Sequence, residues 1–155
     1  MAGFIGEFDC RLDDKGRFVL PSVVKKQLDP ADHDQFVINR GFEGNLNLYP
    51  MKEWEKLMAK VNRRVNEFSE KGRRFLRQLR NGATPVSLDS SGRILIPPSL
   101  AGYAGLSKDL MVIGATDYIE LWDKVKYEQE MKEGLADYSK LAEELLGNLK
   151  EGDDQ

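Results

Sequence analysis

The chain has 155 residues, of which 41% are hydrophobic and 32% charged, with a formal net charge of −3. These values are ordinary for a globular protein of one domain or two closely fused halves, and no apolar run is long enough for a membrane-spanning helix. The single cysteine, Cys10, excludes an intrachain disulfide and favours a reducing, cytoplasmic location. One cysteine and one histidine are too few for an ordinary zinc site, so we expect no metal and no cofactor.

The first predicted elements are two short strands joined by a tight turn. Phe8, Cys10 and Leu12 alternate with polar residues, which predicts a half-buried strand. The turn at residues 13–16 has acidic side chains that can cap backbone amides and a glycine that tolerates positive φ. Further elements of this first unit are expected as a strand at 18–20, a helix at 22–28, and strands at 36–38 and 46–49.

A long helix is predicted between about residues 52 and 79, because its apolar residues recur at helical spacing. Gly72 interrupts the pattern and marks either a kink or a break into two helices. Between Lys60 and Arg80 the chain has eight basic and two acidic residues, a net charge of +6. This segment could contact a polyanion, but we favour pairing with an acidic segment of the same or a neighbouring chain.

The remaining predicted elements repeat those of the first unit. Strands are expected at 86–88, 94–96, 111–113 and 118–122, with a short helix at 98–104. A last helix is predicted at about 125–149, with leucines at regular spacing. From Tyr127 to Gln155 there are three basic and nine acidic residues, a net charge of −6.

The two units share one sequence motif. Asp13 to Pro21 recurs as Asp89 to Pro97 without a gap, at an offset of 76 residues. Asp, Gly, Arg and Pro are identical, and the three residues between Arg and Pro are apolar both times. The third strands of the two units match at an offset of 75 residues, and the fourth strands match at 73. Such a repeat implies two copies of a unit too small to bury a sufficient core alone.

The repeated motif places a tight corner between two strands, with an acidic and a basic side chain beside it. The arginine has five donors in a fork that suits phosphate oxygens or guanine O6 and N7 in the major groove. The alternative is an Asp13–Arg17 or Asp89–Arg93 ion pair that only braces the loop. The residues alone leave both interpretations open.

Two copies of Asp-x-x-Gly-Arg, three apolar residues and Pro, separated by a long helix, resemble the MraZ family of bacterial transcriptional regulators. The resemblance implies an α+β fold with a mainly β core: a pseudo-twofold, swapped-hairpin double barrel of two β-α-β-β repeats of the SpoVT/AbrB type. It divides the chain into repeat 1 (6–54), a linking helix (55–81), repeat 2 (82–127) and a C-terminal acidic helix and tail (128–155). It also implies a homo-oligomeric ring, located in the cytoplasm at the nucleoid, without membrane association. The ring is expected to bind short direct repeats in double-stranded DNA upstream of a cell-division and cell-wall gene cluster that includes its own gene.

The resemblance assigns DNA contact to four basic residues: Arg17, Arg93, Lys15 and Arg11. It assigns the shaping of the two loops to Asp13, Gly16, Asp89 and Gly92. The second repeat departs from the first because Ser91 stands opposite Lys15 and Ser87 opposite Arg11. This departure suggests that the first repeat contributes more of the electrostatic affinity.

Three other functions compete with DNA-binding regulation for this sequence: an enzyme, an antitoxin-like protein and a structural ring. Two aspartates related by a pseudo-twofold resemble the carboxylate pair of aspartic proteases, but the neighbouring residues differ from that family's motif, and no nucleotide-binding or Ser/His/Asp motif is present. We therefore expect no enzyme. An antitoxin-like protein that binds a toxin through its acidic tail, and a purely structural ring, remain as alternatives.

Overall fold

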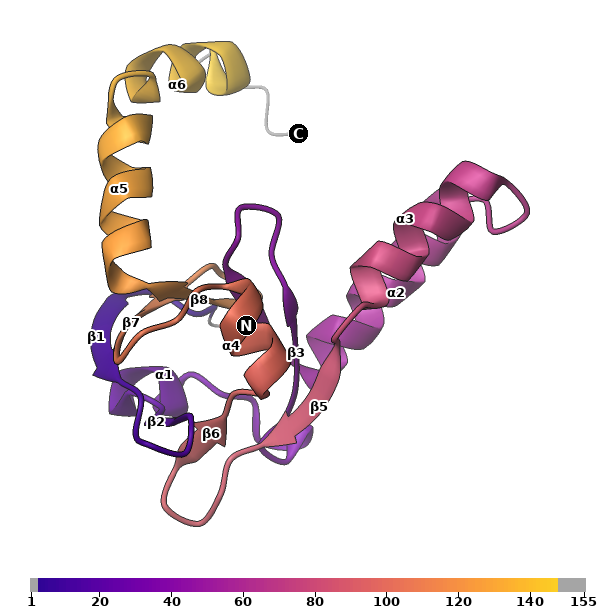
Figure 1. Cartoon of the computed structure of the whole chain (residues 1–155). Helices are drawn as coiled ribbons and strands as arrows, with labels where there is room; N and C mark the ends of the chain where they lie inside the picture. Colours follow the sequence, from indigo (N-terminus) through magenta and orange to yellow (C-terminus); the bar gives the residue numbers. More distant parts are fainter. Residues whose placement is uncertain (1–2, 148–155) are drawn as a thin grey trace. The chain divides into compact units, whose positions relative to one another are not determined.

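The computed structural model describes residues 3–147, which form two compact units, residues 3–124 and 125–147. The first unit contains a six-stranded antiparallel sheet, a separate two-stranded ribbon and four α-helices, and the second contains two α-helices (Figure 1). The predicted α+β class with a mainly β core is confirmed. None of the helices in residues 3–147 combines the length and the hydropathy needed to span a bilayer.

The described elements follow the predicted order. The strands are β1 (Glu7–Arg11), β2 (Arg17–Val19), β3 (Gln35–Arg40), β4 (Leu46–Pro50), β5 (Thr84–Ser87), β6 (Arg93–Leu95), β7 (Asp109–Gly114) and β8 (Ile119–Asp123). The helices are α1 (Ser22–Lys26), a 3₁₀ turn at Pro30–Asp32, α2 (Met51–Arg64), α3 (Glu70–Arg80), α4 (Pro98–Tyr103), α5 (Lys124–Leu135) and α6 (Tyr138–Leu146). Both β-α-β-β units are therefore present.

The two repeats exchange their first strands. The sheet order is β1-β7-β8-β4-β3-β5, so β1 of the first repeat pairs with β7 of the second, and β5 of the second pairs with β3 of the first. Strands β4 and β8 join the two repeats at the centre of the sheet. Neither repeat completes its own sheet, which explains in physical terms why a single copy would not bury a sufficient core.

The pairing has an internal twofold symmetry. In the ribbon, Phe18 faces its repeat counterpart Ile94. At the centre of the sheet, Asn47 faces its counterpart Glu120. The symmetry axis passes between the members of both pairs, because each residue there lies opposite its own equivalent.

The strand register corrects one detail of the sequence repeat. Phe8 pairs with Val112, and its counterpart Thr84 pairs with Ile38. Ile38 and Val112 are therefore equivalent, so the third strands are offset by 74 residues and not by 75. The residues around Ile38 and Val112 are apolar in both strands, so a shift of one position still aligns apolar residues with apolar residues. The sequence alone therefore does not distinguish the two offsets.

The six-stranded sheet is open and does not form a closed barrel, so the predicted swapped-hairpin double barrel is not confirmed. Its outer strands β1 and β5 each pair on one side only. The ribbon of β2 and β6 cannot close the gap, because its strands have three residues each and pair with one another. Its flanking amides bind the two loops: the Leu20 N–H donates to Gly92 O (3.0 Å) and the Ile96 N–H to Gly16 O (2.9 Å).

The core lies between the sheet, the ribbon and the short helices α1 and α4 (Figure 1). Both repeats supply it at equivalent positions. Fully buried side chains include Phe18, Ile94, Val24, Leu100, Phe36, Leu110, Leu48 and Leu121. Because paired positions from the two repeats fill one core, burial of this apolar surface stabilises both copies at once.

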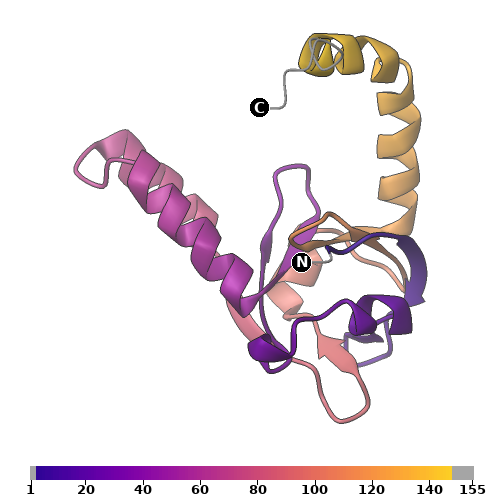
Figure 2. The same ribbon diagram turned by 180° about the vertical axis from the view of Figure 1, so that it is seen from behind.

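The linking helix is two antiparallel helices, not one. α2 ends at Arg64 and α3 begins at Glu70, and the two lie side by side in both views (Figure 2). Ser69 caps α3, because its Oγ accepts from the Gly72 N–H at 2.9 Å. A Cβ atom on Gly72 would lie 2.0 Å from Asn66 O, so the turn needs glycine there. Of the two predictions made for Gly72, a kink or a break into two helices, the break is therefore confirmed.

The predicted C-terminal helix is also divided. In the second unit α5 ends at Leu135 and α6 begins at Tyr138, with Asp137 at its start. The Leu141 N–H donates to Asp137 O at 2.8 Å, which starts the hydrogen-bond ladder of α6. Residue 149, where the predicted helix ends, lies outside the described residues.

Candidate nucleic-acid interface

The two copies of the motif form a pair of loops at one end of the first unit. The first loop joins β1 to β2 and the second joins β5 to β6. Both lie at the same end of the sheet in Figures 1 and 2. Each glycine carbonyl accepts a hydrogen bond from the residue that directly follows the ribbon strand of the other motif, so the two loops hold one another in place.

Each aspartate binds its own loop through three hydrogen bonds. Asp13 Oδ1 accepts from the backbone N–H groups of Lys15 and Arg17, both at 2.9 Å, and its Oδ2 accepts from Arg17 Nε at 2.8 Å. Asp89 repeats this arrangement with Ser91 and Arg93, with all three distances at 2.9 Å. A carboxylate is needed because the aspartate must accept both amides and a guanidinium.

The glycine of each motif adopts a conformation that few other residues tolerate. The φ angle is +82° at Gly16 and +74° at Gly92. The N–H of each glycine donates to the carbonyl of its own loop aspartate, at 3.0 Å for Asp13 and 2.9 Å for Asp89. A side chain at either position would strain the turn that starts the ribbon.

The ribbon has a buried face and an exposed face. Phe18 and Ile94 point inwards. Alternation along both strands puts the outer neighbours on the opposite face: Arg17, Val19, Arg93 and Leu95. Val19 and Leu95 are 59% and 51% exposed. Sequence reasoning treated them as ordinary strand residues, although strict alternation from Phe18 would have placed them beside the arginines.

Both arginines are half-buried, with side chains that are 26% and 31% exposed. Their Nε atoms are occupied by Asp13 and Asp89. Within the part of the chain that the structure describes, the Nη atoms of Arg17 and Arg93 have no protein partner. The ion pair therefore braces the loop and also orients the guanidinium, so the two sequence interpretations are compatible. Two outward Nη groups can bind guanine O6 and N7, or two phosphate oxygens.

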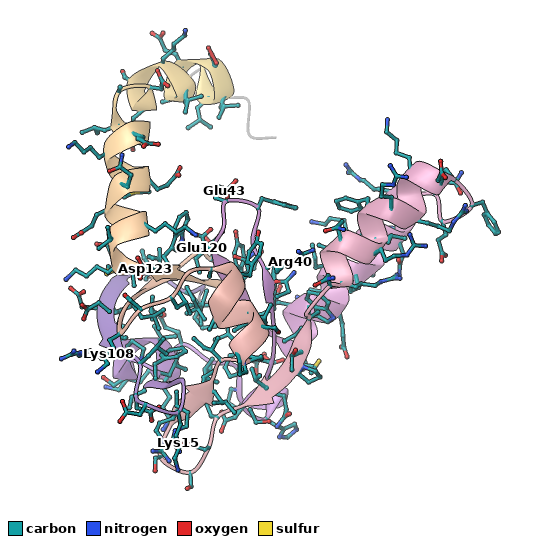
Figure 3. All side chains as sticks on the ribbon, viewed as in Figure 1. Lys15, Arg40, Glu43, Lys108, Glu120 and Asp123 are labelled. Carbon is teal, nitrogen blue, oxygen red and sulfur yellow. The ribbon has the colours of Figure 1, made fainter. Side chains whose placement is uncertain are left out.

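The other two predicted basic residues lie in different surroundings. Lys15 projects from the first loop, and Figure 3 shows it at the opposite end of the unit from Glu43 and Glu120. Arg11 is on β1, where its Nε lies 3.7 Å from Asp109 Oδ1 of β7. Lys15 therefore lies at the end of the unit formed by the two loops, whereas Arg11 lies on the edge strand next to an acidic residue.

Hydrogen bonding to the loop lowers the pKa of both aspartates. The largest cause is the hydrogen bond from the backbone N–H of Arg17 for Asp13 and of Arg93 for Asp89. Desolvation, the second cause, raises the pKa, and the arginine side chains lower it further. Because the folded-state pKa lies below the unfolded value, these bonds stabilise the fold above the unfolded pKa of about 3.9. This contribution is lost as the pH falls through the folded-state values.

We predict that the free energy of unfolding of the double variant Asp13→Asn/Asp89→Asn depends less on pH than that of the wild-type protein. The free energy of unfolding by urea, measured at pH values between about 6 and 2, should fall for both proteins because other carboxylates titrate too. The difference between them should shrink as the pH decreases. The replacement Asp14→Asn, at an exposed neighbour, is the matched control. A constant difference at all pH values would contradict the assignment.

The loop chemistry does not form a catalytic pair of carboxylates. Asp13 and Asp89 belong to separate loops, and each is bound by its own arginine. An aspartic dyad instead needs two carboxylates that share one proton. Among residues 3–147 no cluster of three or more His, Cys, Asp or Glu side chains is arranged to hold a metal ion.

Comparison with known proteins supports the resemblance noted for the repeated motif. A family model with the description "MraZ protein, putative antitoxin-like" matches residues 4–78 and again residues 79–149. The two matched segments each contain one loop, one ribbon strand and its arginine.

Curated relatives match nearly the whole chain. A protein of Christiangramia forsetii named "Transcriptional regulator MraZ" is 44% identical over 149 residues, with 96% of each chain covered. Proteins of the same name from Flavobacterium psychrophilum and Clostridium acetobutylicum are 39% and 36% identical; the matches cover 97% and 92% of this chain and 96% of each relative. All three names describe regulators of transcription and none describes an enzyme.

Proposed function

The chain belongs to the MraZ family, and from this membership we propose that it is a sequence-specific DNA-binding regulator of transcription and not an enzyme. Its target is short direct repeats in double-stranded DNA upstream of a cell-division and cell-wall gene cluster that includes its own gene. It acts in the cytoplasm, at the nucleoid. The division into 6–54, 55–81, 82–127 and 128–155 remains part of this proposal.

The observation that carries the proposal is the outward face of the ribbon. Arg17 and Arg93 lie there with Nη groups that have no protein partner in the described residues, and their aspartates hold the guanidinium groups in orientation. Arginine forks recognise guanine, and the exposed Val19 and Leu95 beside them suit the methyl group of thymine. Backbone phosphates add a sequence-independent, salt-sensitive contribution through Lys15.

We propose that several copies act together as a ring. One ribbon offers only a few cationic contacts, so a single site binds weakly. Adjacent copies on spaced repeats would make the later contacts intramolecular and raise affinity by roughly 10²–10⁴-fold. Large apolar side chains that are left exposed support assembly, and the most exposed in the first unit are Phe42 (81%) and Phe68 (92%).

We predict that affinity rises steeply with the number of repeats. Fluorescence anisotropy would compare duplexes with one, two and three copies of the repeat upstream of the protein's own gene, at several salt concentrations. A scrambled duplex controls for sequence. A duplex whose repeats are shifted by about half a helical turn, roughly 5 bp, controls for geometry.

Each outcome of that titration bears on one part of the proposal. Equal affinity for one, two and three repeats would contradict cooperation between copies. Equal, weak binding to native and scrambled DNA would contradict the DNA assignment itself. Sedimentation of the free protein as a monomer would contradict the ring.

One observation favours a second function. The matching family model is described as putative antitoxin-like, and several large apolar residues of α6 are exposed, including Tyr138 (71%) and Leu145 (77%). An antitoxin-like protein would use such a surface to bind a toxin, whereas a ring would cover it with a neighbouring copy. Co-purification of a second protein in fixed ratio, in place of self-assembly, would favour the antitoxin.

A further inference from the structure

The second loop lacks the lysine of the first but has gained one from another element. Lys15 in the first loop is replaced by Ser91 in the second. The position that a Cβ atom would occupy on Gly92 lies 3.4 Å from Nζ of Lys25, the fourth residue of α1. In the first loop, the nearest atoms to the same position on Gly16 are Ile96 O and Leu95 Cδ1, and no charged group is among them.

The exchange between the repeats brings Lys25 to this place. The Leu20 N–H donates to Gly92 O at 3.0 Å, so the chain that leaves β2 passes beside the second loop before α1 begins. The equivalent chain after β6 passes beside the first loop, but α4 has the sequence Pro-Ser-Leu-Ala-Gly-Tyr and contains no charge. Lysine from α1 is thus available only to the second loop.

The ammonium group of Lys25 is available to a ligand. Lys25 is exposed, while Gly92 beneath it is buried and its counterpart Gly16 only half-buried. In the described residues no carboxylate lies within ion-pair distance of Lys25. A lysine that lies beside a loop without a counterion is suited to a phosphate oxygen, which it binds as a point charge.

The charges of the two loops change the expectation drawn from sequence. Residues 13–17 contain two acidic and two basic side chains, and residues 89–93 contain one of each, so each loop has a formal charge of zero. Lys15 is therefore offset by Asp14, whereas Lys25 adds an uncompensated positive charge to the second loop.

We infer that Lys25 is a DNA-contacting residue that gives the second loop the phosphate contact missing from its own sequence. This inference rests on the proposed function. It replaces the expectation that the first repeat dominates the electrostatic affinity: both loops bind phosphate, one through its own lysine and the other through a lysine of the opposite repeat.

The test is a set of variants in which the positive charge of Lys25 is removed and a positive charge is then introduced at position 91 of the second loop. On a duplex with a single repeat, Lys25→Ala should weaken binding several-fold. The negative slope of log affinity against log salt should become less steep by about 0.9, the value for one phosphate. Ser91→Lys in the Lys25→Ala background should restore both, since the Ser91 N–H binds Asp89 as the Lys15 N–H binds Asp13. Lys26→Ala is the matched control, because Lys26 lines a different hollow with Phe4 and Asp29.

Failure of this inference differs from failure of the proposed function. If the wild-type protein prefers its native repeat but Lys25→Ala binds with unchanged affinity and salt slope, the inference is overturned. An equal loss in Lys26→Ala would also overturn it, because the effect would then be one of net charge. No recovery with Ser91→Lys would overturn it as well, because a lysine in the second loop would then not replace the contact of Lys25. If the wild-type protein shows no preference for native DNA, the proposed function fails first.

Discussion

Replacing Arg17 or Arg93 by alanine is expected to remove most specific DNA affinity while leaving the fold intact. A bidentate arginine–guanine contact contributes about 1–3 kcal/mol of discrimination, roughly 5- to 150-fold for each site. Each active copy in a ring would lose this contact, so the effect on several repeats should exceed that on one. The fold should survive, because the Asp13–Arg17 ion pair lies at the surface, where solvent screens it and its contribution to stability is small.

The measurement is anisotropy with native and scrambled duplexes, together with thermal unfolding and sedimentation of each variant. Arg17→Lys and Arg93→Lys keep the charge but lose the fork, so they should retain non-specific binding and lose sequence preference. Lys26→Ala is the matched control for loss of one positive charge, because Lys26 lines a different pocket with Phe4 and Asp29. Native-like specificity in Arg17→Ala/Arg93→Ala, with the oligomer intact, would show that the arginines only brace their loops.

Replacing Phe18 by alanine is expected to cost about 3–5 kcal/mol of folding free energy. Phe18 is 1% exposed and faces Ile94, which is fully buried, at the symmetry axis of the ribbon. A cavity there would be lined by residues of both repeats, and short strands joined across the axis cannot collapse to fill it. Because a domain has only about 5–15 kcal/mol of stability, the loss is a large part of the total.

Urea unfolding, followed by tryptophan fluorescence and circular dichroism, would measure this loss. Val19→Ala is the control: Val19 is the next residue on the same strand, 59% exposed, and should change stability by less than about 0.5 kcal/mol. Phe18→Leu retains most of the volume and should lie between the two. A change below 1 kcal/mol in Phe18→Ala would mean that the ribbon does not depend on this buried pair.

The sequence predicted the local features of the candidate site correctly because they depend on residues close in the chain. Positive φ at Gly16 follows from a glycine in a two-strand turn, and the bonds of Asp13 reach no further than Arg17, four residues away. The existence and order of strands and helices follow from apolar periodicity in the same way. The proposed DNA contact of the arginines was likewise suggested by motif and resemblance alone.

Other features depend on which distant segments pair, and only the tertiary structure decided them. An alternating strand such as β1 can pair with any free sheet edge, so nothing in its own residues selects β7 over β3. The open sheet, the 74-residue offset and the turn that Gly72 permits beside Asn66 arise from backbone packing. Lys25 lies 76 residues from its own repeat equivalent, and its place beside Gly92 exists only because the repeats exchange strands. Local chemistry thus determined what each loop contains, and long-range pairing determined which residues stand next to it.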